Sequence, residues 1–221
     1  MYYKIRASIN MKEIGNFPQI QKFIKNYDDD KENSCSNIAR YSIDEKTKLA
    51  FDFDGLQIGK KTILTDYMSC SYLNSLAGLL ISKRFFEFIK SCKFPEYECF
   101  NVKIYQNETY IDNEYYWIHY IKKYPELINF NKSIFFINHP EANYKILNIK
   151  SNDELYRFQK SINYLIDFKH MVLNKDVLSE FDFFRLGTID GETYINDNMK
   201  KKMIDFGING LVYIPVEIET Y

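Results

Sequence analysis

The chain has 221 residues, and its 29 basic side chains nearly balance its 30 acidic ones, which leaves a formal net charge of −1 at pH 7. This balance argues against a general nucleic-acid-binding protein, which usually carries a basic excess, and equally against an acidic mimic of DNA. The 19 tyrosines and 18 phenylalanines predict a core built on large rings. A chain of this length forms either one large domain or two small lobes.

The four cysteines form no Cys-x-x-Cys pair and have no histidine at zinc-ligand spacing, so the sequence predicts no metal site. Residues 1–13 lack an apolar signal core, and no stretch approaches the roughly 18 apolar residues that a membrane span needs. We therefore expect a cytoplasmic protein without membrane contact, whose cysteines are reduced and mostly buried. A disulfide between Cys92 and Cys99 is the alternative.

The first 60 residues predict two strands and a short helix. Alternation in residues 2–8 predicts a strand, and a helix is predicted at Ile20–Tyr27. Residues 49–59 predict a strand that ends in an Asp-Gly turn at Asp54, with Asp52 on the same face as Asp54. Such a pair of carboxylates can bind a cation or act as an acid and a base. No third ligand is identifiable, so the pattern favours an exposed strand edge.

The middle of the chain predicts a helix followed by an antiparallel strand pair. Ser82 is placed to cap the helix. The apolar stripe of this helix, which we expect to face inward, consists of Phe85, Phe86, Ile89 and Cys92. Residues 97–110 and 115–121 are rich in aromatic and β-branched residues, and they predict the two strands.

The three histidines are scattered along the chain. His119 is expected to share a strand face with Trp117 and Ile121, which favours a buried neutral histidine over a general base. His139 and His170 lie elsewhere, and the chain has no Gly-rich phosphate loop, no Gly-x-Ser-x-Gly elbow and no His-Glu-x-x-His helix. The sequence therefore predicts no catalytic residue, no cofactor and no metal.

The C-terminal third begins with a helix and a hairpin. Ser151 and Glu154 have the spacing of a capping box, and they precede a helical stripe formed by Leu155, Phe158 and Ile162. Phe183–Leu186 and Thr193–Ile195 are predicted to form a hairpin with an Asp190–Gly191 turn.

The chain ends in a helix and a strand. Asn196 or Asn198 is placed to cap the helix, whose expected inward residues are Met199, Met203 and Phe206. Gly207 is predicted to end this helix in a left-handed conformation, closed by a contact from Ile208. An Asn209–Gly210 turn then lets residues 211–215 return beside the hairpin, and Pro215 indicates either a sheet edge or the end of the strand.

Strands and helices occur in clusters without regular alternation, which predicts an α+β fold with mostly antiparallel sheet and several packed helices. The C-terminal part forms a strand-hairpin-helix-strand unit. We expect a single domain over residues 1–221 or two lobes, an N-terminal one at 1–76 and a C-terminal one at 77–221.

The order of the C-terminal elements resembles a family of bacterial immunity proteins from polymorphic toxin systems, formerly described as a domain of unknown function. The resemblance covers roughly residues 63 to 215. It consists of an Ile-Ser-x-x-Phe helix start, a Tyr-rich strand, and a Phe-Arg strand followed by a helix and a Gly-x-x-Gly-x-x-Phe/Tyr ending. The matching residues are Ile81, Ser82, Phe85, Tyr115 to Ile118, Phe184, Arg185, Gly207, Gly210 and Tyr213.

The resemblance implies a non-enzymatic inhibitor that binds a cognate toxin domain in the cytoplasm and blocks it by protein–protein occlusion. The link at residues 139–163 looks longer than the family's usual connection, which makes it a candidate place for partner specificity. Interface candidates are the acidic and aromatic side chains of two segments: Asp112, Glu114 and Tyr115 in the first, and Glu141, Tyr144, Asp153 and Tyr156 in the second. The alternative for each is an ordinary solvated surface residue. Gly207, Gly210 and Arg185 are interpreted as structural, with Arg185 paired to a carboxylate or to backbone carbonyls.

Two other classes of protein compete with this interpretation. One is a small cytoplasmic hydrolase or transferase whose site assembles from His119, Asp52 or Asp54, and Arg185. The other is an adaptor that oligomerises through an aromatic face.

Overall fold

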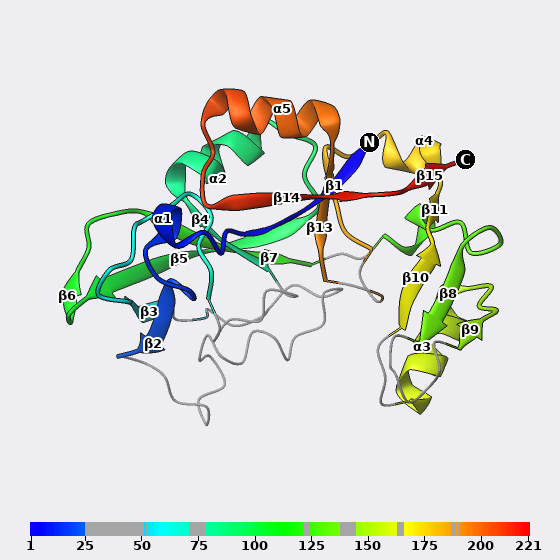
Figure 1. The fold of residues 1–221 in the computed structure, drawn as a ribbon, viewed down its shortest axis with the longest axis horizontal. Coiled ribbons are helices and arrows are strands. Elements are labelled where there is room, and N and C mark those ends of the chain that lie inside the picture. The colour runs from blue at the N-terminus through cyan, green and yellow to red at the C-terminus, as the bar shows by residue number, and fades with distance from the viewer. Residues whose placement is uncertain are drawn as a thin grey trace.

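The computed structural model describes residues 1–24, 51, 53–70, 78–121, 124–137, 145–162, 166–186, 189 and 191–221. Within these ranges the fold is α+β with mainly antiparallel sheets, as predicted. Figure 1 shows the helices α2 (Lys83–Lys90) and α5 (Asp197–Phe206) together along one side of the molecule.

A four-stranded antiparallel sheet joins the two ends of the chain. Its strand order is β12 (Phe183–Phe184), β13 (Thr193–Asn196), β1 (Tyr2–Ala7) and β14 (Leu211–Val216). The predicted pairing of the hairpin strands is confirmed, since Phe183 pairs with Ile195. The expectation that the last strand packs beside the hairpin was wrong, because β1 lies between them and pairs with β14 over its whole length. Pro215 does lie on the edge strand.

A larger six-stranded sheet carries the middle of the chain. Its order is β2 (Ile20–Phe23), β3 (Phe53–Ile58), β5 (Tyr97–Gln106), β7 (Tyr115–Tyr120) and β4 (Gly78–Ser82), and β6 (Thr109–Tyr110) pairs with β5. The predicted antiparallel pair is confirmed as β5 and β7, whereas β3 and β5 are parallel.

Two local predictions in this sheet were wrong. Ile20–Phe23 is a strand instead of a helix, because Ile20 is fully buried and pairs with Ile58 of β3, so tertiary pairing overrides the local pattern. Residues 54 and 55 form no terminal turn, because β3 continues to Ile58. Gly55 instead has a φ of 105° where the register against β5 shifts, which is the geometry of a β-bulge.

The remaining strands form two small sheets. One has the order β10 (Ile166–His170), β8 (Ile134–Ile137) and β9 (Ile146–Leu147), and the other pairs β11 (Val172–Leu173) with β15 (Glu219–Thr220) in parallel. The short helices are α1 (Met11–Ile14), α4 (Lys175–Leu178) and the 3₁₀ turn η2 (Pro125–Leu127).

The predicted helix caps are confirmed. Ser82 Oγ accepts from Phe85 N at 3.2 Å in α2, and Ser151 Oγ accepts from Glu154 N at 3.1 Å at the start of α3 (Asn152–Ser161). Asn196 Oδ1 accepts from Met199 N at 2.8 Å. At the other end of α5, Gly207 has a φ of 78° in the left-handed region, and Ile208 N donates to Met203 O at 3.0 Å.

The buried faces of α2 and α5 differ in part from prediction. Met199 and Met203 are fully buried, but Phe206 is 49% exposed because it lies at the helix end, where its ring contacts Phe88 at 5.1 Å between centroids. In α2, Phe85 and Ile89 are buried as predicted, and Phe88 is buried as well. Phe86, and Cys92 just after the helix, are only half-buried. Cys70, Cys92 and Cys99 form no disulfide, and Cys35 lies outside the described residues. The expectation that the cysteines are mostly buried was wrong for these three, because Cys99 is exposed and the other two are half-buried.

In the described part of the chain, the buried apolar side chains form three clusters: one around α2 and α5, one around the small three-stranded sheet and one on the six-stranded sheet. Strand pairs join residues on both sides of position 76, since β1 pairs with β13 and β14, and β3 pairs with β5. Among the described residues, none of the helices is both long enough and apolar enough to span a membrane.

Candidate functional site: the Asp66 groove

An open, polar groove lies where the N-terminus of α2, the loop before β7 and the turn between α5 and β14 meet. Its volume is about 570 Å³. We call it the Asp66 groove, and the described residues that line it are Leu64, Thr65, Asp66, Ser82, Lys83, Arg84, Asp112, Asn113, Glu114, Tyr115 and Asn209. In Figure 1 this region is at the end of the molecule that carries α1 and the start of α2.

Asp66 forms the floor of the groove and is only 5% exposed. Its carboxylate accepts hydrogen bonds from Ser82 Oγ at 2.6 Å, from Arg84 Nε at 3.0 Å and from Asn209 N at 3.0 Å, and it forms an ion pair with Arg84 Nη2. Burial by itself raises the pKa of Asp66, but these bonds from Arg84, Ser82 and Asn209 outweigh it and hold the pKa below its usual value. Asp66 is therefore a fixed negative charge at neutral pH.

The turn at residues 207–210 is locked onto Asp66. Asn209 and Asp66 bond reciprocally, because Asp66 N also donates to Asn209 Oδ1 at 2.8 Å. Arg84 Nη2 donates to Gly207 O at 2.8 Å, and Gly210 N donates to Glu13 Oε1 at 2.8 Å. Gly210 has a φ of 80°, and a Cβ there would lie 2.4 Å from the carbonyl oxygen of Tyr67. Gly207 and Gly210 thus allow the left-handed backbone conformations of this turn, and the turn places Asn209 in the groove.

The rim of the groove is acidic and accessible. Asp112, Asn113 and Glu114 are exposed, and Glu114 forms an exposed ion pair with Lys83. The backbone of this loop is held as well, since Lys83 N donates to Glu114 O at 2.9 Å. The rim therefore presents carboxylates from a segment whose backbone is anchored to α2.

The predicted interface residues fall in different places. Asp112 and Glu114 lie together on the rim. Tyr115, in contrast, is only 5% exposed, and its hydroxyl donates to Thr65 O at 2.9 Å. Burial raises the pKa of this hydroxyl well above its usual value. Tyr115 therefore lines the groove with little exposed surface, in contrast to the accessible interface residue that was predicted.

The other candidates lie away from the groove. Asp153 and Tyr156 are exposed on α3, which Figure 1 shows beside β8 and β10 at the opposite end of the molecule from α1. The ring of Tyr156 is covered by Lys160 Nζ at 4.4 Å from its centroid. Glu141 and Tyr144 lie outside the described residues. The structure thus brings together two of the acidic candidates and separates them from those on α3.

Of the residues proposed for the rival enzyme, the three that the structure describes, His119, Asp54 and Arg185, do not converge. Arg185 is 2% exposed, donates to the backbone carbonyl of Gly191 and lies 4.1 Å from the ring centroid of Tyr120. Tyr120 and the fully buried His119 are neighbours in β7, and successive residues of a strand point to opposite faces. Arg185, which packs on the Tyr120 ring, therefore lies on the face of β7 opposite to His119. The contacts of Arg185 are those expected of a structural arginine.

Asp54 is also remote from His119. In the sheet Asp54 pairs with Lys103 and His119 pairs with Glu98, which are five positions apart on β5, or about 17 Å at about 3.4 Å per residue. Asp54 Oδ1 accepts from the Tyr105 hydroxyl at 2.6 Å. Asp52 lies outside the described residues. In the part of the chain that the structure describes, no three His, Cys, Asp or Glu side chains are grouped as metal ligands.

Sequence reasoning missed Asp66, Arg84 and Asn209, which hold the floor of the groove. The Asn209–Gly210 pair carried a turn signal, but nothing local to it indicates a bond to a residue 143 positions away.

In comparisons with known proteins, no family model matches the chain, and no curated protein matches it.

Proposed function

We propose that the protein is an immunity protein that binds a cognate toxin domain of a bacterial polymorphic toxin system and neutralises it by occlusion in the cytoplasm. The observation that carries this proposal is the Asp66 groove, an open site with a rigid floor and an acidic rim at Asp112 and Glu114. The resemblance of the C-terminal elements to immunity proteins supports the same class.

The construction of the groove suits an inhibitor that binds without rearrangement. The floor is held by the bonds that Asp66 makes to Ser82, Arg84 and Asn209. A site ordered before association loses little conformational entropy on binding, and more of the contact energy is retained as affinity. The same bonds fix the start of α2 and the turn at residues 207–210 relative to Asp66.

The charges of the groove indicate the kind of surface it fits. Its lining holds three carboxylates against two cations, and Arg84 and Lys83 are already paired with Asp66 and Glu114. A basic patch on the toxin domain would meet the exposed carboxylates of Asp112 and Glu114. Such rim charges speed association and reject partners of the wrong sign more than they add affinity.

The test is coexpression with the toxin encoded beside the gene, read out as rescue of growth and as a one-to-one complex in size-exclusion chromatography. The double variant Asp112→Lys, Glu114→Lys should raise the Kd of the complex at least about ten-fold, because it places like charges against the basic patch. The matched control is Asp153→Lys, Tyr156→Ala on α3, which should bind as the wild type does.

The possible outcomes distinguish an error in the proposed function from an error in the proposed position of the interface. If the wild-type protein neither rescues growth nor forms a complex, the proposed function is wrong. Loss of binding in the α3 variant, with the groove variant unaffected, would instead move the interface to α3 and leave the function in place.

A further inference from the structure

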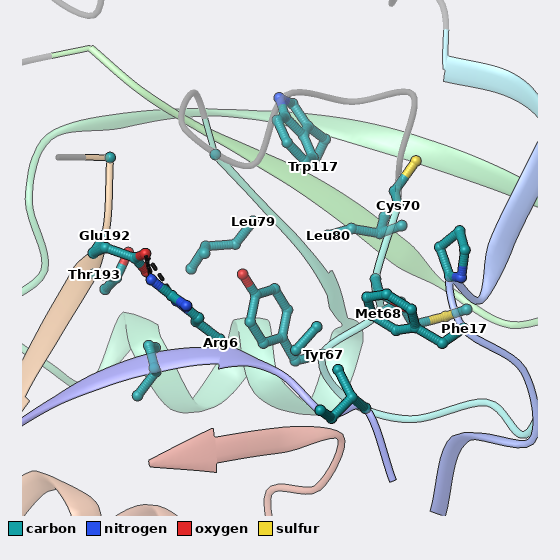
Figure 2. Close-up of a pocket in the computed structure, with 17 residues that line it drawn as sticks. Arg6, Phe17, Tyr67, Met68, Cys70, Leu79, Leu80, Trp117, Glu192 and Thr193 are labelled. Carbon is teal, nitrogen blue, oxygen red and sulfur yellow. Dashed lines mark hydrogen bonds and ion pairs between the residues drawn. The ribbon is translucent and has the colours of Figure 1, made fainter. Parts of the chain in front are cut away.

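A second hollow, distinct from the Asp66 groove, lies between β1 and β4. Figure 2 shows this cavity, and among the described residues most of its wall is apolar. Ile5 and Ala7 come from β1, Leu79 and Leu80 from β4, Trp117 from β7, and Met68 from the segment before β4. Its volume is about 450 Å³. Small-molecule sites span about 300 to 1,000 Å³, and at about 30 Å³ for each water-sized group the cavity has room for roughly fifteen such groups.

The hydroxyl of Tyr67 points into this cavity. Tyr67 is 7% exposed, and Figure 2 shows its hydroxyl oxygen directed away from the backbone and toward the space beside Leu79 and Arg6. Within the described residues this hydroxyl has no hydrogen-bond partner. Burial raises the pKa of Tyr67 well above its usual value, so the group stays a protonated donor at physiological pH. The hydroxyl oxygen is not fully enclosed by protein, so it is open to the cavity, and a molecule held there can accept its hydrogen bond.

The charged side chains in the described wall are Arg6 and Glu192, and they neutralise each other. Arg6 Nε donates to Glu192 Oε1 at 2.8 Å, and Arg6 Nη2 makes a second contact with the same oxygen. A charged ligand would leave water without gaining a counter-ion in this wall, which costs free energy. The cavity therefore favours an uncharged ligand.

We propose that this cavity binds an uncharged, largely apolar molecule of about fifteen non-hydrogen atoms, with a carbonyl group that accepts a hydrogen bond from the Tyr67 hydroxyl. The cavity volume limits the size of the ligand, and the apolar wall requires that most of the ligand be apolar. The Tyr67 hydroxyl calls for one hydrogen-bond acceptor on it. This site goes beyond the proposed function and does not depend on it, because the cavity and the Asp66 groove share no lining residue.

A fluorescence titration with prodan, an uncharged naphthyl ketone, tests the proposal. We expect saturable one-to-one binding with a blue shift of the emission. The variant Tyr67→Phe removes only the donor and should raise the Kd about three- to ten-fold, the range for loss of one hydrogen bond. The matched control is Tyr115→Phe, whose hydroxyl bonds to Thr65 O outside the cavity, and it should leave the Kd unchanged.

A prodan analogue with a methylene group in place of the ketone completes the double-mutant cycle. It should compete with prodan more weakly, and its affinity should be the same for the wild type and for Tyr67→Phe, because the donor and the acceptor act as one pair.

Alkylation of Cys70 locates the bound probe. Figure 2 shows the Cys70 sulfur in the wall near Trp117, so saturating prodan should slow its reaction with N-ethylmaleimide several-fold while the rate at the exposed Cys99 stays the same. The proposal is overturned by any of three results: no saturable binding, equal affinity of prodan for Tyr67→Phe and the wild type, or binding that leaves Cys70 alkylation unchanged.

Discussion

Replacement of Asp66 by alanine tests whether the floor of the groove is an ordered structural unit. The substitution removes the acceptor for Asn209 N, for Ser82 Oγ and for Arg84 Nε. The loss of this acceptor does not cost the three donors the same amount of stabilising free energy. The Ser82 hydroxyl can rotate to another acceptor, and the Arg84 side chain is 48% exposed and regains water, whereas Asn209 N is a backbone donor held by the turn.

The magnitude follows from these unequal losses. A buried donor left without a partner costs about 1–3 kcal/mol, and the partly buried Asn209 N falls toward the lower end of that range. A hydrogen bond to a charged group contributes about 1.5–3 kcal/mol. After discounting for the hydration of Arg84, we expect Asp66→Ala to lower the free energy of unfolding by about 2–4 kcal/mol. Asp66→Asn keeps the shape of the side chain and one acceptor, so its cost should be smaller.

Urea unfolding followed by tryptophan fluorescence measures this change. The chain has a single tryptophan, Trp117, which is 2% exposed and reports on the six-stranded sheet. The control is Asp205→Ala, which removes an exposed ion pair to Lys201 and should leave the midpoint unchanged. A midpoint for Asp66→Ala equal to that of the wild type, at the same m-value, would refute the reasoning.

The stability difference should also depend on pH. The folded pKa of Asp66 is below its unfolded value, so its stabilising effect is present above the unfolded pKa of about 3.9 and is lost as the pH falls through the folded pKa. The wild type and Asp66→Ala should therefore differ fully near pH 7 and converge in acid. A difference that persists at the lowest pH would mean that the carboxylate charge is not what stabilises the floor.

Two further pairs of substitutions probe the same region by urea unfolding. Gly207→Ala should cost about 1–2 kcal/mol for its left-handed backbone alone, since the nearest atom to an added Cβ is on the Arg84 side chain at 3.8 Å, an ordinary contact distance. Gly210→Ala should cost more, because its Cβ would also meet the Tyr67 carbonyl oxygen at 2.4 Å, and equal costs would contradict this reasoning. Tyr115→Phe should cost about 1 kcal/mol because it removes the bond to Thr65 O, whereas Tyr67→Phe should cost less; the reverse order would show that the Tyr67 hydroxyl has a partner within the protein.

Local signals in the sequence predicted the parts of this fold that depend on neighbouring residues. The caps at Ser82, Ser151 and Asn196 each bond to an amide three positions away, so their spacing alone was sufficient. Gly207 was predictable for the same reason, because a left-handed helix end has a strong preference for glycine.

Arrangements that join distant segments were not predictable in this way. Nothing in residues 183–216 indicates that β1 inserts between β13 and β14, because the partner strand lies at the other end of the chain. Ile20–Phe23 became a strand because β3 pairs with it. The groove has the same origin, since Asp66 and Asn209 are 143 positions apart and only the tertiary fold brings them together.

Asp66 and Tyr67 are consecutive, so one short segment carries the floor of the groove and one wall of the cavity. Asp66 N donates to Asn209 Oδ1 at 2.8 Å, and Tyr67 N donates to Asn209 O at 3.2 Å, so Asn209 holds the backbone of both residues. Asp66→Ala frees Asn209 from its bond to the carboxylate. We therefore expect this variant to weaken prodan binding, although Asp66 does not line the cavity, whereas Asp112→Lys should leave the Kd of prodan unchanged. An unchanged Kd in Asp66→Ala would show that the anchor on Asn209 does not position Tyr67.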